Sequence, residues 1–146
     1  MVAADGCSRT IRLMEGRDLA VILARGRIAI GVVSLSAPEL VGRTMAGRAG
    51  SQGATRLFAR MVGARDLGLG LGVLVALDRG APVRGWLEAS AVVDGLDAVA
   101  CLVARHHIRT SVFPAAVGLA AAGALLSARL ARQLDPAQSP LSGPGR

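Results

Sequence analysis

The sequence has no lysine and no tyrosine, only two cysteines, and an aromatic content of 2% over 146 residues. Soluble cores normally use aromatic side chains, because each one buries a large area. Single-stranded nucleic-acid sites use them as stacking platforms. The scarcity of aromatics therefore argues against both classes of protein. Cys7 lies near the N-terminus and Cys101 lies inside an apolar run, so we expect neither a disulfide nor a metal site.

Hydrophobic residues make up 52% of the chain, mostly Ala, Gly, Val and Leu, and charged residues only 18%. Soluble domains carry about 25% charged residues. All seventeen basic residues are arginines, and the net charge is +7. They lie in short clusters between apolar runs, which is typical of the flanks of membrane spans. The composition predicts a membrane protein that has the lipid bilayer, and no nucleic acid, as its partner.

Four apolar runs predict an all-α fold, a four-helix transmembrane bundle. The run TSVFPAAVGLAAAGALLSA, residues 110–128, has no charge and is long enough to span a bilayer. The other three runs contain charged residues. Their even spacing beside a clear span nevertheless indicates a single membrane domain that extends from residue 18 to residue 132. Short connectors predict an up-down antiparallel order. The expected spans are residues 19–38, 57–77, 86–104 and 110–130.

The segments outside the spans carry weaker signals. Residues 1–17 form a polar N-terminal segment without the apolar stretch of a cleavable signal peptide, so the first span is expected to act as an uncleaved signal. Residues 39–55 predict a loop with a short surface helix, and the Pro-, Ser- and Gly-rich tail 133–146 predicts disorder. We expect a multi-pass protein of the cell membrane, with a slight arginine bias that favours cytoplasmic termini.

Charged residues inside a span each cost roughly 2.5–3.5 kcal/mol, so they are expected to pair in the bundle interior. The second and third spans form a hairpin that turns at residues 78–84, and residues at equal depth then have numbers that sum to about 162. Arg65 comes level with Asp97, and Gly68 comes level with Asp94. The first span, read in the same way, brings Arg27 level with Asp94. The predicted interhelical polar cluster consists of Arg25, Arg27, Arg65, Asp66, Asp94 and Asp97.

The glycines of GLGLG, residues 68–72, do not match the GxGxxG pattern of a dinucleotide loop, so we predict no cofactor there. Gly68 and Gly72 are four residues apart, a spacing that lets helix backbones approach closely. We predict that they pack against a neighbouring helix. His106 and His107 are adjacent and point apart on a helix, so they predict no metal site.

The segments GARDLGLG and DGLDA, within a stretch of roughly residues 20–130, resemble a family of small four-helix membrane proteins in the style of the DoxX-like group. The resemblance implies an integral membrane protein with four helices, and it carries over no catalytic residue. Some DoxX-like proteins are linked to quinol oxidase or thiosulfate metabolism. This chain has no haem, quinone or redox-cysteine motif, so we do not expect it to share those activities.

Three functional classes remain open. The favoured one is a structural or accessory membrane protein whose charges organise the bundle, with a second copy or another membrane protein as partner. The alternative is a small binding or transport protein whose Asp94/Asp97 face receives a proton or a polar ligand. Four-helix exporters also use a membrane carboxylate, but they add aromatics for cationic drugs, which are scarce here. A membrane enzyme would need a nucleophile with a base, a metal set or a cofactor loop, and the sequence suggests none.

Overall fold

The computed structural model describes residues 2–134, with side chains from residue 14 onward. This part of the chain is all-helical and contains no strand, which confirms the predicted all-α class. Residues 135–146, most of the tail for which disorder is predicted, lie outside it. The elements are α1 (Val2–Ser36), α2 (Pro38–Ala46), η1 (Gly47–Ser51), α3 (Gly53–Asp78), α4 (Arg84–Val103), η2 (Arg105–His107) and α5 (Phe113–Gln133).

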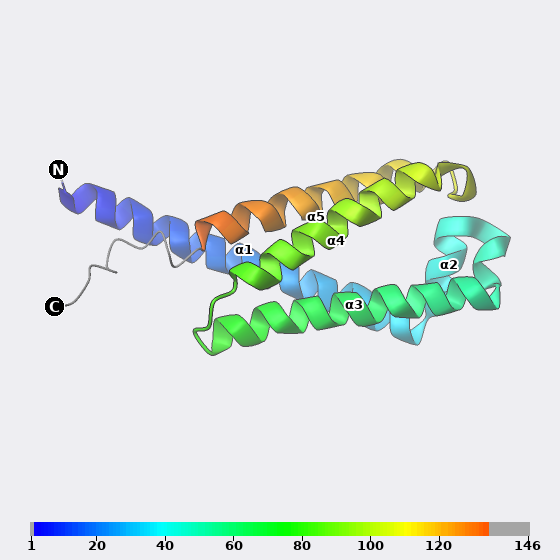
Figure 1. Cartoon of the computed structure of the whole chain (residues 1–146), viewed down its shortest axis with the longest axis horizontal. Coiled ribbons are helices and arrows are strands. Elements are labelled where there is room, and N and C mark those ends of the chain that lie inside the picture. Colours follow the sequence, from blue (N-terminus) through cyan, green and yellow to red (C-terminus); the bar gives the residue numbers. More distant parts are fainter. Residues whose placement is uncertain (1, 135–146) are drawn as a thin grey trace.

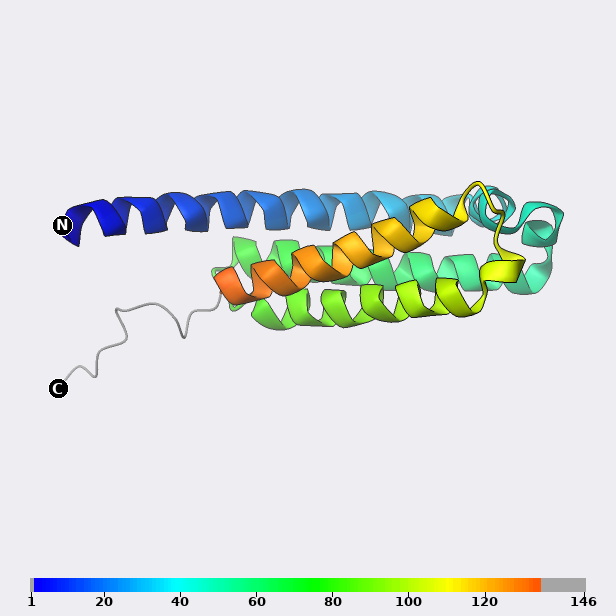
Figure 2. The same cartoon turned by 90° about the horizontal axis from the view of Figure 1, so that it is seen from above.

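The four long helices run alternately up and down beside one another, and α1 starts at the same end at which α5 finishes (Figures 1 and 2). The closest packing is between α1 and α3 and between α4 and α5. Smaller contacts join α1 to α5 and α3 to α4. The predicted hairpin of α3 and α4 is therefore packed less closely than the pair α1 and α3 and the pair α4 and α5.

Proline and glycine determine where several helices stop. Pro38 has no N–H and disfavours the helical conformation at the preceding residue, so α1 ends at Ser36 and α2 begins at Pro38. Gly80 has a φ of 62° in the turn between α3 and α4, a conformation that glycine adopts without strain. At the other end, α1 already begins at Val2. Residues 2–17 therefore continue the first helix, whereas the sequence suggested a separate segment.

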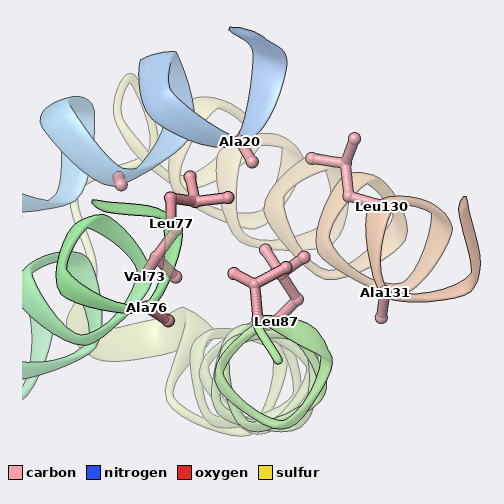
Figure 3. Packing of buried hydrophobic residues seen from close by; sticks show 9 residues of the cluster. Ala20, Val73, Ala76, Leu77, Leu87, Leu130 and Ala131 are labelled. Carbon is pink, nitrogen blue, oxygen red and sulfur yellow. The ribbon is translucent and has the colours of Figure 1, made fainter. Parts of the chain in front are cut away.

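The apolar core lies at the end of the helices near the Gly80 turn. Leu87 of α4 points between the other three helices toward Leu77 and Leu130 (Figure 3). Buried positions along each helix are three or four residues apart, the spacing of helices that pack with a left-handed twist. The core consists of Ala20, Ala24, Val73, Ala76, Leu77, Val83, Leu87, Leu130 and Ala131.

Large apolar side chains are exposed on the outer faces of the four long helices. Ile22 of α1 is 66% exposed, Leu96 of α4 63% and Leu125 of α5 72%, and α3 exposes Phe58 and Met61. Two helical stretches, Met14–Ser36 and Phe113–Gln133, are long and apolar enough to cross a membrane. The four spans predicted from the sequence are therefore reduced to two by this criterion, because α3 and α4 carry more charged residues.

Candidate functional site

An arginine in the middle of α1 connects three helices. Arg27 Nη1 donates a hydrogen bond to Asp66 Oδ1 of α3 at 3.1 Å, and Nη2 donates to Asp94 Oδ2 of α4. The Ser90 carbonyl oxygen lies 3.5 Å from the same Nη2 atom. The side chain of Arg27 is only 7% exposed, so these bonds form away from solvent. Buried charges are stable only when they are paired and hydrogen-bonded. Arg27 is paired with two carboxylates, and only its Nε has no hydrogen-bond partner among the described residues.

A second arginine extends the network along α3. Arg65 Nη1 and Nη2 donate to the two oxygens of Asp97 at 3.0 and 2.7 Å, a bidentate pair. Arg65 Nη2 also donates to Asp66 Oδ1 at 3.2 Å. Asp66 Oδ1 thus accepts from both arginines and connects the two halves. The outer half is more accessible, because 29% of the Arg65 side chain and 37% of the Asp97 side chain are exposed.

The structure brings five of the six predicted cluster residues together. Arg65 lies level with Asp97 and Arg27 with Asp94, at the depths that the hairpin spacing predicts. Arg25 is not part of the network, and its inclusion was wrong. It is exposed and lines a groove between α1 and α3. Two residues along a helix differ by about 200° in direction, so Arg25 and Arg27 cannot both face the interior.

The glycines that let helices approach are not the predicted ones. A Cβ atom at Gly68 would meet nothing within 4 Å, so the expectation that Gly68 packs is wrong. A Cβ at Gly70 would lie 2.7 Å from the Ala24 carbonyl oxygen, and one at Gly63 would lie 2.9 Å from the Gly31 carbonyl oxygen. The buried stripe of α3 therefore runs through positions 63, 66 and 70, with Gly68 on the opposite side.

Gly72 does take part in packing, but against a ring and not against a helix backbone. A Cβ there would collide with the indole of Trp86 at the start of α4. Gly72 thus makes room for the only tryptophan of the chain. The two glycines predicted to pack therefore differ in the structure: Gly68 faces open space, whereas Gly72 lies against an aromatic side chain.

Three residues of this region were not singled out from the sequence. A Cβ at Gly123 of α5 would lie 2.5 Å from Asp94 Oδ2, so the glycine makes space for that carboxylate. Ser90 and Ser127 are 1% and 0% exposed, and neither hydroxyl has a hydrogen-bond partner among the described residues. Ser90 and Asp94 are four residues apart and therefore share one face of α4. This spacing is the sequence signal that could have identified Ser90.

The network carries unequal charge. Two guanidinium groups, of Arg27 and Arg65, face three carboxylates, of Asp66, Asp94 and Asp97. The interior can therefore hold helices together electrostatically, and it has one carboxylate in excess. Over residues 14–134 no group of three or more His, Cys, Asp or Glu side chains is arranged to hold a metal ion.

No protein-family model, curated protein or solved structure matches the chain. The similarity to DoxX-like proteins therefore stays a prediction from the segments that carry it.

Proposed function

We propose that the chain is a multi-pass membrane protein in which α1, α3, α4 and α5 all cross the bilayer. In this proposal, the Arg27–Asp66–Asp94 and Arg65–Asp97 contacts hold α1, α3 and α4 in register, and the protein acts as a structural or accessory component. One observation carries the proposal: large apolar side chains are exposed along all four long helices, while charged and hydroxyl side chains such as Arg27, Asp66 and Ser127 are buried between them. Soluble domains have the opposite arrangement, because water solvates their outer faces.

The charges of α3 and α4 are compatible with a bilayer in this arrangement. A hydropathy window penalises Arg65, Asp66, Asp94 and Asp97 wherever they point. Their side chains bond to one another and to Arg27 between the helices, which is the usual environment of charged residues inside membrane proteins. Length supports the proposal as well. The 26, 20 and 21 residues of α3, α4 and α5 correspond to at least about 30 Å, the thickness of the hydrocarbon layer.

The structural role follows from how the network connects the helices. Arg27 contacts α3 and α4, and Arg65 contacts α4, so three ion pairs between helices act on the relative depth of α1, α3 and α4. Apolar outer faces in lipid have little preference for one depth over another, because lipid tails and leucine side chains are equally apolar. A buried polar group that must find its partner does specify register.

Cysteine accessibility tests the number of passes. In a background without Cys7 and Cys101, single cysteines at Arg48, Ala81 and His107 are labelled with a membrane-impermeant maleimide in sealed vesicles of known orientation. Four passes place Arg48 and His107 on one side and Ala81 on the other. If only α1 and α5 cross, all three positions lie on the same side. Release from membranes by carbonate, without detergent, would refute the membrane proposal altogether.

A second candidate function is that of a proton or polar-ligand binding protein, in which the Asp94/Asp97 face is the site. The observation in its favour is the excess carboxylate, together with the partial exposure of Asp97. Proteoliposomes loaded with a pH-sensitive dye test it under an imposed potential. Proton flux above that of empty liposomes, lost in Asp94→Asn and kept in Glu88→Gln, would support the binding role. Flux equal to that of empty liposomes would remove proton coupling from consideration.

A further inference from the structure

Arg25 is left without a partner. It is exposed on α1, and it has no hydrogen bond or ion pair within the described part of the chain. In the proposed membrane arrangement it lies eight residues deeper than Arg17, about 12 Å along the helix. A guanidinium at that depth is expensive in hydrocarbon unless an anion or water reaches it. The sequence suggested that an aspartate of the interior neutralises Arg25, but the structure uses all of those aspartates elsewhere.

The groove beside Arg25 has the lining that a charged amphiphile requires. It encloses about 460 Å³ between α1 and α3, and its apolar walls include Val21, Leu74 and Val75. Arg17 lies at the same groove and donates through Nη2 to the Leu77 carbonyl oxygen at 2.6 Å, which holds its guanidinium in place.

The charge of the groove is positive. Asp78 is its one acidic residue, against the two arginines Arg17 and Arg25. Side chains on a helix lean toward its N-terminus, so Arg25 extends in the direction of Arg17. An anion between the two guanidiniums would lie nearer the end of the helices than the Cα atom of Arg25 does.

We propose that this groove binds an anionic phospholipid, with the phosphate between Arg25 and Arg17 and an acyl chain along Val21, Leu74 and Val75. The inference rests on the proposed membrane location. A guanidinium matches a phosphate in charge and in its bidentate geometry. Basic pockets between membrane helices are a recurrent way of holding lipid headgroups. We propose a lipid and not a free anion because the apolar wall of the groove can contact an acyl chain.

Lipid titration of the full chain in a nonionic detergent tests the proposal, with native mass spectrometry as the readout. We expect phosphatidylglycerol to bind and phosphatidylcholine to bind much more weakly. Arg25→Gln should weaken phosphatidylglycerol binding roughly tenfold, the effect of losing one charge-assisted contact. Arg129→Gln is the matched control, because it removes the same charge from α5 outside the groove and should leave binding unchanged.

Three outcomes would overturn the proposal. Equal weakening by Arg25→Gln and Arg129→Gln would mean that only net charge matters. Equal binding of both lipids would remove the role of the anionic headgroup, and inorganic phosphate that competes as well as the lipid would remove the role of the acyl chain. Circular dichroism without added lipid checks that both variants fold. Cysteine labelling that supports four passes, combined with any of these outcomes, would refute the lipid site and leave the membrane proposal standing.

Discussion

The Arg27–Asp94 pair provides the sharpest test of the ionic network. Arg27→Met keeps an unbranched side chain of similar length but removes the charge. Asp94→Asn is the matched change on α4, since it is isosteric and Gly123 leaves no room for a larger side chain there. The two single variants and the double variant form a cycle that isolates the energy of the pair.

The contacts of each residue determine the expected magnitudes. Arg27→Met leaves Asp94 buried without a cation, whereas Asp66 keeps Arg65, so unfolding free energy should fall by about 3–5 kcal/mol. Asp94→Asn leaves Arg27 bonded to Asp66 and still offers an amide oxygen, so the loss should be about 1–2 kcal/mol. In the Arg27→Met background the same change removes an unpaired charge. Asp94→Asn should therefore destabilise the wild type and stabilise the Arg27→Met variant.

Reversible unfolding in mixed detergent micelles measures this cycle. Fluorescence of Trp86, the only tryptophan, reports on the packing of α4 against Gly72 of α3, and circular dichroism serves as a second probe. We expect a coupling energy of at least about 2 kcal/mol, compared with an average of about 0.6 kcal/mol for hydrogen bonds between membrane helices.

An exposed ion pair is the control for this experiment. Glu39 and Arg43 of α2 lie 2.8 Å apart, with 45% and 63% of their side chains exposed. Their cycle of Gln variants should give a coupling below about 0.5 kcal/mol. If Asp94→Asn destabilises both backgrounds of the Arg27 cycle, or if the two cycles give equal couplings, the interior pair does not behave as a buried ion pair and the reasoning is wrong.

The glycine contacts and the register give two further predictions. Gly70→Ala places a Cβ 2.7 Å from a backbone oxygen of α1 and should lower unfolding free energy by about 1–3 kcal/mol, whereas Gly68→Ala points into open space and should raise it by up to about 1 kcal/mol. Thermal unfolding in detergent checks both, and shifts in the same direction would contradict the packing described here. Gly63→Ala should also lower unfolding free energy, because a Cβ at Gly63 lies 2.8 Å from Ser34 Cβ, closer than real Cβ atoms approach. Cysteine pairs in a Cys-free background test the register. The pair at Gly68 and Asp94 should fail to cross-link, and efficient cross-linking there would mean that α3 presents a different face to α1 and α4.

Position along the helix axis could be derived from the sequence. A helix rises by a constant amount per residue, and the tight turn at 78–84 starts α3 and α4 from a common level. These two local quantities are enough to bring Arg65 level with Asp97. The helical class followed from apolar runs with polar breaks between them, and the end of α1 followed from Pro38.

Direction around the helix axis was harder to derive, although part of the signal was present. The sequence analysis places Arg25 and Arg27 in one cluster, but they point to different sides of α1. The same error placed Gly68 at a helix contact that Gly70 makes. Buried positions spaced three and four residues apart, such as 63, 66 and 70, would have separated the two faces before the fold was known.

Which of the neighbouring helices pack most closely was decided only by the tertiary structure. The up-down order predicted from the sequence makes every two successive helices neighbours, yet α3 packs chiefly on α1, and α4 on α5, while α3 and α4 touch only lightly. This packing brings Gly123 against Asp94. It depends on how well side-chain surfaces distant in the chain fit together, and on which carboxylates a buried guanidinium can reach. Rise per residue and turn length are local properties and can be read from a sequence, whereas fit between distant surfaces exists only once all four helices are in place.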